Sequence, residues 1–322
     1  MVFPEVDLGD ARRRDSVLFE TNQMKNFYWI DSFDGYPQTM DEVIRTSLDV
    51  YNGLYATYTE ALGYKFRLIH LEDMYIASGE APIAWHGEFG NILTQDGAAY
   101  VGLIHPDLQR ERKQESLYRL IANSTNVRLL NYTAKFPMVC KDKFRGVDIA
   151  RKLGLHALTT ALLGAECSTR SQLDFAEQTV GSYPMFIRPR DLTSGLGKRT
   201  INDRAGLQKY IENPPFPGRL HIIQPCISIE AEYRVYLDRC EIVACRRREP
   251  LKEGELCATP DAILEGSRAL AEHLETTYLC VDWLWTGSEF WFCEFETGGG
   301  FSELSEPHRS RVAAAFFRKL AA

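Results

Sequence analysis

Three carboxylates near the end of the chain are spaced so that one metal ion could bind them all. Asp282 lies in the apolar run 279–285, and Glu294 and Glu296 lie in or next to the apolar run 289–295. Residues i and i+2 of a strand face the same side, so the two glutamates share a face, and Asp282 can lie opposite them in a hairpin. Clustered carboxylates repel one another unless a cation neutralises them, and their hard oxygen atoms suit Mg²⁺ or Mn²⁺.

A glycine-rich segment follows directly after these acids. Residues 297–301 read Thr-Gly-Gly-Gly-Phe, and glycines let backbone N–H groups come close to a ligand. The spacing alone leaves an alternative open, in which the acids are only the solvated face of an edge hairpin. The adjoining glycine segment favours the metal site over that alternative.

A second group of residues combines cations with glycines. The strand-like run 183–189 contains Arg188, and the polar loop 190–199 follows it. The loop contains the small residues Ser194, Gly195 and Gly197, and its basic residues include Lys198. Small residues let backbone N–H groups approach phosphate oxygens, and flanking cations hold the charge. The spacing is not that of a P-loop, because no GxxxxGK[ST] is present, so an ordinary turn stays an alternative.

Two further basic segments could hold an anion. Arg246, Arg247 and Arg248 are adjacent at the end of a strand-like run, where three like charges repel one another unless an anion lies among them. Lys141 and Lys143 stand at the start of a helical segment, where a lysine opposes the helix dipole unless it reaches an anion. The alternative for the arginines is a solvated strand end.

The elements that position these residues divide the chain into two halves. Strands and helices alternate in the first half, which predicts an α/β domain, and short strands follow one another in the second, which predicts an antiparallel-rich α+β region. The strand-like runs are 27–31, 65–71, 99–104, 183–189, 220–224, 232–237, 241–247, 279–285 and 289–295. The helical segments are 40–62, 117–121, 141–163, 205–211, 261–274 and 312–320.

The composition is that of an ordinary globular chain with an acidic balance. Its 322 residues are 45% hydrophobic and 25% charged, which excludes disordered, collagen-like and coiled-coil proteins. With 37 lysines and arginines against 44 acids, the net charge is −7, which argues against a nucleic-acid partner. The 8 cysteines show no CxxC spacing, and neither a signal peptide nor an apolar run of about 20 residues is present. We therefore expect a cytoplasmic protein outside membranes.

In this order the segments resemble the ATP-grasp ligase superfamily over residues 141–301, half of the chain. The positions that match its ATP-binding residues are Lys143, Arg188, Ser194, Gly195, Gly197, Gln224, Cys226, Ile227 and Glu232. Those that match its metal ligands are Asp282, Glu294 and Glu296. Two positions depart from the family pattern. Arg188 replaces the second ATP-binding lysine, as in a minor clade of candidate peptide or amino-acid ligases, and Glu296 stands where the family usually has asparagine.

The resemblance implies a fold and a division into domains. The fold is an α/β N-terminal domain followed by a two-lobed α+β ATP-grasp fold. Residues 25–140 would form the N-terminal substrate domain, 141–215 the first ATP-grasp lobe, and 216–322 the second lobe with the metal site. Residues 1–24 would be a flexible tail.

The resemblance also implies a chemistry, which is ATP-dependent ligation of a carboxylate to an amine through an acyl phosphate, with Mg²⁺ or Mn²⁺. Lys143 and Arg188 would hold the α- and β-phosphates, and Arg248 would neutralise the γ-phosphate or the acyl phosphate. Arg248 and Arg188 are thus the implied catalytic cations, and residues 298–300 could donate N–H groups to the acyl oxygen.

The implied substrates are amino acids or peptides. Dimers are common in the superfamily, which leaves a homodimer open, and the sequence does not give the oligomeric state. Two alternatives remain open: a phosphotransferase that acts on a hydroxyl group, and a nucleotide-binding protein without turnover.

Overall fold

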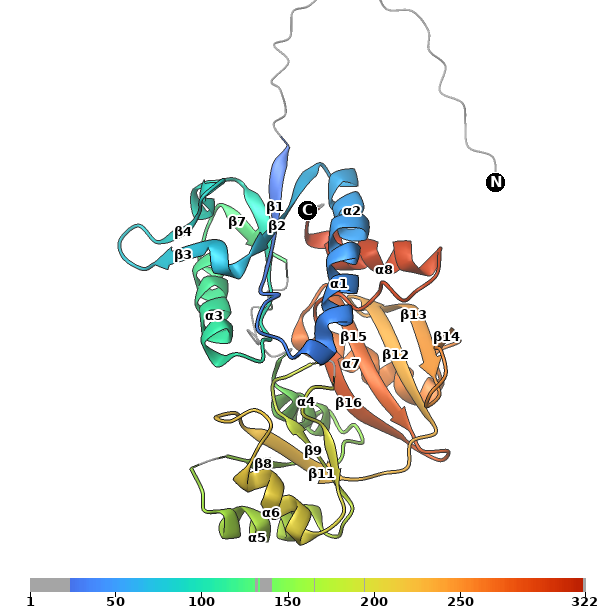
Figure 1. Ribbon diagram of the computed structural model, residues 1–322. Helices are drawn as coiled ribbons and strands as arrows, with labels where there is room; N and C mark the ends of the chain where they lie inside the picture. The colour runs from blue at the N-terminus through green and yellow to red at the C-terminus, as the bar shows by residue number, and fades with distance from the viewer. Residues whose placement is uncertain (1–23, 131–132, 134–140, 165, 194, 321–322) are drawn as a thin grey trace, which may run out of the picture.

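We describe the protein from a computed structural model, which describes residues 24–130, 133, 141–164, 166–193 and 195–320 (Figure 1). Residues 1–23 of the tail expected over 1–24, and the predicted phosphate-loop residue Ser194, lie outside this range. Four sheets carry the described strands, three large ones and one small one.

A four-stranded parallel sheet forms the N-terminal part, in the order β2-β1-β6-β7. Its strands are β1 (Lys25–Asp31), β2 (Tyr64–His70), β6 (Gly97–Val101) and β7 (Val127–Leu129). Alternate residues of β1 enter two different cores, Phe27 and Trp29 on one face and Tyr28 and Ile30 on the other. Both faces are therefore covered, as parallel sheets require, and the expected α/β N-terminal domain is confirmed.

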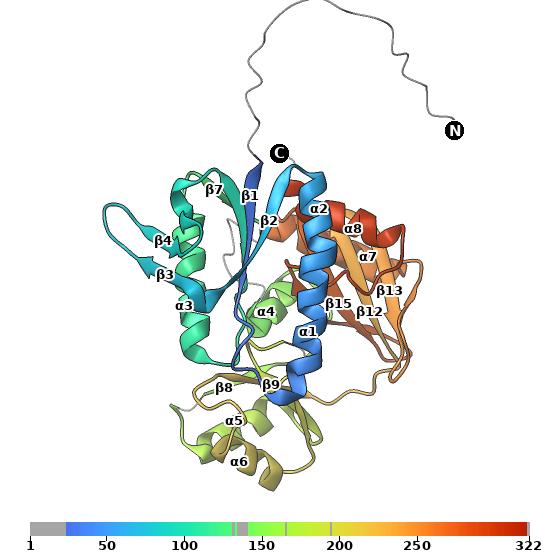
Figure 2. The same cartoon turned by 45° about the horizontal axis from the view of Figure 1, so that its top comes forward.

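Helices cover the two faces of this sheet. On one face α1 (Asp41–Val50), the π turn η2 (Tyr51–Tyr55) and α2 (Ala56–Ala61) continue one another, after the 3-10 turn η1 (Gln38–Met40). Figure 2 shows α1 and α2 as one rod between the parallel sheet and the C-terminal sheet. On the other face lies α3 (Leu108–Ala122), which begins where the Asp107 side chain accepts bonds from two backbone N–H groups. The helix expected over 40–62 is thus confirmed, apart from its π turn.

A small antiparallel sheet extends beside α3. Its strands are β3 (Met74–Ala77), β4 (Ile83–His86) and β5 (Gly90–Asn91), with the 3-10 turns η3 (Leu71–Asp73) and η4 (Ile92–Thr94) on either side. The sequence analysis did not predict this sheet, because its strands are short and Tyr75 and Trp85 face solvent.

The next sheet is antiparallel, in the order β10-β9-β11-β8. Its strands are β8 (Ala161–Leu163), β9 (Met185–Pro189), β10 (Arg199–Ile201) and β11 (His221–Pro225). The helices α5 (Thr169–Val180) and α6 (Arg204–Glu212) pack on it, and α4 (Lys143–Lys152) lies between this sheet and the next (Figure 1).

The last sheet is antiparallel in the order β14-β13-β12-β15-β16. Its strands are β12 (Ala231–Asp238), β13 (Glu241–Arg248), β14 (Glu255–Leu256), β15 (Tyr278–Trp285) and β16 (Phe290–Glu296). One face packs on α7 (Asp261–Leu274) and α4, and the other on α8 (His308–Phe316) and the 3-10 turn η6 (Phe317–Leu320). The second half is therefore the expected antiparallel α+β region.

The helix expected over 141–163 is wrong beyond Lys152. The chain leaves the helix at Leu153, and Gly154 then takes a φ of +76°, a left-handed conformation that glycine adopts without strain. Residues 161–163 instead form β8, which pairs with β11 at the edge of the sheet. The apolar residues of this segment serve a strand because that pairing buries them, which local periodicity does not reveal.

The division into domains remains a prediction. The sheet that contains β8–β10 also contains β11, which follows the boundary expected at residue 215. Within the described residues, no helix is long and apolar enough to cross a membrane.

Candidate active site

A cavity of about 620 Å³ is here called the first cavity. It lies between the sheet β10-β9-β11-β8, the sheet β14-β13-β12-β15-β16 and the N-terminus of α4. Six basic side chains line it, and they come from α4, β9, the following loop, β12 and β13: Lys143, Arg188, Lys198, Arg234, Arg246 and Arg248. The acids in its wall are Glu232, Asp282, Glu294 and Glu303. Such a concentration of cations at one cavity attracts an anion even though the whole chain is acidic.

Asp282 and Glu294 face each other across the β15–β16 hairpin, as expected from the sequence. Glu294 lies between two cations, 3.5 Å from Lys143 Nζ and 3.2 Å from Arg188 Nη1. Burial alone would raise the pKa of Glu294, but Lys143, Arg188 and Arg234 outweigh it and lower that pKa. Glu294 is therefore a charged carboxylate at neutral pH.

Arg188 extends from β9 towards this carboxylate. Burial would lower its pKa, and the neighbouring Cys293 and Glu294 raise it. Its Nε is buried and has no hydrogen-bond partner among the described residues. An unmatched buried donor on a cation is costly, and an anion in the first cavity would satisfy it. The resemblance implies a lysine at the position of Arg188. Arg188 thus offers an N–H donor to an anion in the first cavity.

Glu296 is placed differently from the other two acids. It pairs in register with Cys280 and lines a second, smaller cavity rather than the first. Burial raises its pKa, although Arg234 opposes that rise. Among the residues that the structure describes, no group of three histidine, cysteine or acidic side chains is arranged to hold a metal ion. Asp282 and Glu294 are hard oxygen donors on one wall and fit Mg²⁺, whereas Glu296 would have to turn towards them.

The loop after β9 closes one side of the first cavity. Gly195 and Gly197 each have a φ of +71°, and a Cβ on Gly197 would lie 2.9 Å from Pro189 and 3.0 Å from Phe216. Only glycine fits there. Lys143 Nζ donates a hydrogen bond to the carbonyl of Leu192, which ties the start of α4 to this loop.

The opposite end of the first cavity is apolar and could take a flat ring. Gln224 is buried and donates a hydrogen bond of 2.9 Å to Thr160 Oγ1, so its side chain is already engaged. Cys226 and Ile227 follow on the connection to β12 and line the cavity beside it. The apolar side chains here are Leu158, Phe186, Ile229 and Leu284. A base could contact the backbone of this connection, as the resemblance implies.

Glu232 and Arg248 lie opposite each other on β12 and β13 and form an ion pair. Both line the first cavity. The predicted ribose-binding acid is therefore paired with the predicted catalytic arginine. Arg246, two residues before Arg248, pairs with Glu303 and keeps a buried Nε without a partner among the described residues.

The sequence analysis missed Arg234 as a site residue. Arg234 lies on β12 two residues after Glu232, so both share one face, and it donates two hydrogen bonds to Asp282. The i, i+2 spacing from Glu232 was the signal that could have revealed it.

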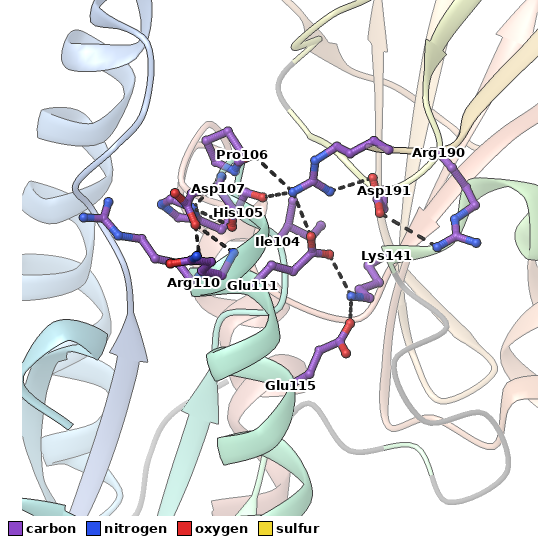
Figure 3. Close-up of polar contacts among 12 residues, drawn as sticks. Ile104, His105, Pro106, Asp107, Arg110, Glu111, Glu115, Lys141, Arg190 and Asp191 are labelled. Atoms are coloured by element: carbon purple, nitrogen blue, oxygen red, sulfur yellow. Dashed lines mark hydrogen bonds and ion pairs between the residues drawn. The ribbon is translucent and has the colours of Figure 1, made fainter. Parts of the chain in front are cut away.

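A buried ionic network connects the N-terminal domain to the loop after β9 (Figure 3). Arg219, which lies just before β11, is 2.7 Å from Glu111 on α3 and 2.8 Å from Asp191 in the loop. Lys141 lies 2.8 Å from the same glutamate. The side chains of Arg219 and Glu111 are 1% and 4% exposed, so these charges are matched by one another rather than by water.

The similarity of this chain to known proteins lies in its structure. No family model matches the chain, and no curated protein matches it. Similar solved structures include macrocyclase MdnC from Microcystis aeruginosa, bound to its precursor peptide MdnA, which is 17% identical with a TM-score of 0.58 over 90% of this chain and 98% of that chain.

Two other solved structures have the same similarity in shape. The ATP-grasp ligase PsnB, complexed with a phosphomimetic variant of its minimal precursor, Mg and ADP, is 12% identical with a TM-score of 0.59 over 92% of this chain and 100% of that chain. A RimK domain ATP-grasp protein from Sphaerobacter thermophilus is 16% identical with a TM-score of 0.62, over 91% and 99% of the two chains. The chain has the ATP-grasp fold, and the fold that the resemblance implied is confirmed.

Proposed function

We propose that this protein is an ATP-dependent carboxylate–amine ligase that joins amino acids or peptides and releases ADP and phosphate. The observation that carries the proposal is the set of six basic side chains around the first cavity, with Glu294 between two of them. The buried Nε atoms of Arg188 and Arg246 have no hydrogen-bond partner in the part of the chain that the structure describes. A polyphosphate supplies the charge and the acceptors that this wall lacks. The ATP-grasp neighbours, two of which are solved with precursor peptides, support the same class of reaction.

In the proposed reaction the substrate carboxylate attacks the γ-phosphorus of ATP. The bond from that phosphorus to the β-γ bridging oxygen breaks, so ADP leaves and an acyl phosphate forms. The amine then attacks the acyl carbon, and phosphate leaves as the amide forms. Such transfer depends on positioning and charge neutralisation. Lys143 and Arg188 hold the nucleotide phosphates, and Arg248 neutralises the transferred group once Glu232 turns to the ribose.

Asp282 and Glu294 would hold Mg²⁺, which lowers the charge repulsion between phosphate and carboxylate when it is bound. In its absence Arg234, Lys143 and Arg188 neutralise these two acids. Glu296 as a third ligand stays a prediction, as do a cytoplasmic location and the absence of a nucleic-acid partner, and a homodimer stays open.

The glycine segment after β16 supports a role in holding the acyl oxygen. Tyr278 Oη donates to the carbonyl of Gly299 at 2.6 Å, and Tyr236 Oη donates to the carbonyl of Gly300 at 3.0 Å. In a trans peptide the N–H points opposite to the carbonyl. The N–H groups that follow these two carbonyls therefore point away from the tyrosines. Gly299 and Gly300 have φ of +68° and +81°, which glycine adopts without strain.

The test is a product analysis with a matched variant. Protein, ATP and Mg²⁺ are incubated with pools of amino acids and dipeptides, and we expect ADP, free phosphate and a new amide-linked mass. Glu294→Gln should lower turnover at least about 100-fold, while Glu289→Gln, on the exposed turn before β16, should not. Release of AMP, or a phosphorylated product without free phosphate, would contradict the ligase and favour a phosphotransferase or another chemistry.

A further inference from the structure

A second cavity of about 240 Å³ adjoins the first, and Thr193 lines both. It lies where the carboxyl ends of β1 and β6 meet α1 and the end of β16. Asp31 ends β1 and Gly102 directly follows β6, while Glu296 ends β16 and Gly298 lies in the segment after it. A molecule in this cavity would therefore lie beside the phosphate-binding wall of the first.

The two cavities have opposite charge. The second is lined by the carboxylates Asp31 and Glu296, and no lysine, arginine or histidine stands among its described lining residues. Its aromatic side chains are Phe33, Tyr36, Tyr51 and Tyr100. Carboxylates together with aromatic rings favour a cation, whereas the six basic residues of the first cavity favour an anion. This contrast separates a cationic substrate from the nucleotide.

The two carboxylate oxygens of Asp31 differ in their hydrogen bonding. Its Oδ1 accepts hydrogen bonds from Ser32 N at 2.9 Å and from Gln114 Nε2 at 3.0 Å, which fixes the carboxylate in one orientation. Its Oδ2 accepts no hydrogen bond from the described residues. A Cβ on Gly102 would lie 2.1 Å from Oδ1, so the carboxylate lies directly against the backbone of the neighbouring strand. Its free oxygen is thus oriented at the cavity edge.

We propose that the second cavity binds the amine substrate as an ammonium group, and that Asp31 Oδ2 accepts the proton that the ammonium must lose. This inference rests on the proposed function and adds the charge state of the second substrate. In the step, the N–H bond of the ammonium breaks and its proton passes to Asp31. The neutral amine then forms the C–N bond to the acyl carbon, the bond from that carbon to the phosphate oxygen breaks, and the second N–H proton of the amine leaves with the phosphate.

The surroundings of Asp31 suit a proton acceptor near neutral pH. Burial raises its pKa to about 7, and the neighbouring Glu72 adds to the rise, while the bonds from Ser32 and Gln114 oppose it. Glu72 is itself paired with Arg110 at 3.2 Å. The other titratable groups that sense Asp31 are Tyr36 and Tyr51, whose own pKa values are raised by burial and then by its charge. A base whose pKa lies close to the working pH is the most effective kind.

The decisive experiment separates the two half-reactions in Asp31→Asn. Amide formation is measured with the amino-acid and dipeptide pool, and acyl-phosphate formation is measured by trapping with hydroxylamine, which is largely uncharged at neutral pH. The variant should lose amide formation on the order of 10-fold to 100-fold and keep hydroxamate formation. Asp73→Asn, at an exposed acid on the neighbouring turn η3, is the matched control and should keep both. Equal loss of both products in Asp31→Asn, or loss of neither, would overturn the proposal.

A binding measurement distinguishes failure of this inference from failure of the proposed function. Calorimetry compares glycinamide, which carries an ammonium group, with glycolamide, which has a hydroxyl in its place. The wild-type protein should bind glycinamide more tightly, and Asp31→Asn should remove the difference. If no ADP is released but this difference is seen, the ammonium site stands without the ligase. If neither probe binds, or both bind equally, the ammonium site is wrong whatever the protein does with ATP.

Discussion

Arg234 donates two parallel hydrogen bonds to Asp282, from Nε to Oδ1 and from Nη2 to Oδ2, each 2.7 Å long. The two residues face each other on the antiparallel strands β12 and β15. The charge of Asp282 is the largest cause that raises the pKa of Arg234 well above its usual value. Burial raises the pKa of Asp282, and Arg234 opposes that rise. A predicted metal ligand is therefore held in place by a cation of the protein itself.

The first prediction concerns the stability of this pair. Arg234→Met leaves Asp282 partly buried without its cation, so we expect a loss of about 2 kcal/mol in the free energy of unfolding. In Arg234→Met/Asp282→Asn the stranded charge is gone, and the loss should be smaller than in the single variant. Urea denaturation measures Arg234→Met, Asp282→Asn and the double variant against the wild type. Arg268→Met, which removes an exposed ion pair with Glu265, should change stability by less than about 0.5 kcal/mol. Additive losses from the two site substitutions would contradict this coupling.

The sequence predicts the hairpin because strand period is a local property. Continued from the turn, the register would place Asp282 opposite Cys293, and a register shift between Asp282 and Trp283 brings Asp282 opposite Glu294 instead. Strand period does not reveal such an irregularity. The cations that hold these two acids are also hard to predict. Arg234 reaches Asp282 because β12 lies beside β15, and this order of strands is a property of the whole sheet.

The position of Glu296 shows a second limit to predicting the site from the sequence. The spacing predicts correctly that Glu296 shares a face of the strand with Glu294. However, β16 ends at Glu296, and the second cavity that Glu296 lines is also lined by residues of the parallel sheet. Which cavity a side chain lines then depends on a domain that is far away in the sequence. For the same reason the residues 25–140 carried no readable motif, although Asp31 and Tyr51 line the second cavity.

The second prediction concerns the glycine segment. In Tyr278→Phe the carbonyl of Gly299 loses its donor inside the core, so we expect a loss of about 1–2 kcal/mol in stability. Under the proposed function, turnover should fall more than the affinity for ATP, because the N–H groups beyond that carbonyl lose their orientation. Tyr75→Phe, at an exposed side chain, should change neither quantity. Nucleotide binding and turnover that fall together would instead indicate a general loss of structure.

The third prediction concerns pH. Burial raises the pKa of Asp31 in the folded protein to about 7, from an ordinary value of 3.8. A raised pKa means that the folded state binds the proton more tightly, so the contribution to stability is present at pH 4 and is lost as the pH rises through 7. Asp31→Asn stays neutral throughout, and its stability relative to the wild type should rise by roughly 2–4 kcal/mol between pH 4 and pH 8. Urea denaturation at several pH values checks this, and Asp73→Asn should follow the wild type. A constant difference across this range would sink the assignment of a raised pKa.

The fourth prediction concerns the buried network around Arg219 (Figure 3). Arg219→Met leaves Asp191 without its closest cation, while Glu111 keeps Lys141 at 2.8 Å. We expect a loss of about 3 kcal/mol in the free energy of unfolding, because a carboxylate that is nearly excluded from water loses its partner. Arg204→Met, which breaks exposed ion pairs with acids on α5, is the matched control and should cost less than about 1 kcal/mol.

The same variant also tests whether the network positions the nucleotide. Asp191 directly precedes Leu192, whose carbonyl accepts the hydrogen bond from Lys143. When Asp191 moves, that carbonyl moves with it, so Lys143 loses a fixed position at the phosphate-binding wall. Under the proposed function we expect Arg219→Met to raise the KM for ATP on the order of 10-fold, and Arg219→Lys, which restores the charge without the fork, to recover part of it. A stability loss with an unchanged KM for ATP would mean that the network joins the domains without positioning the loop.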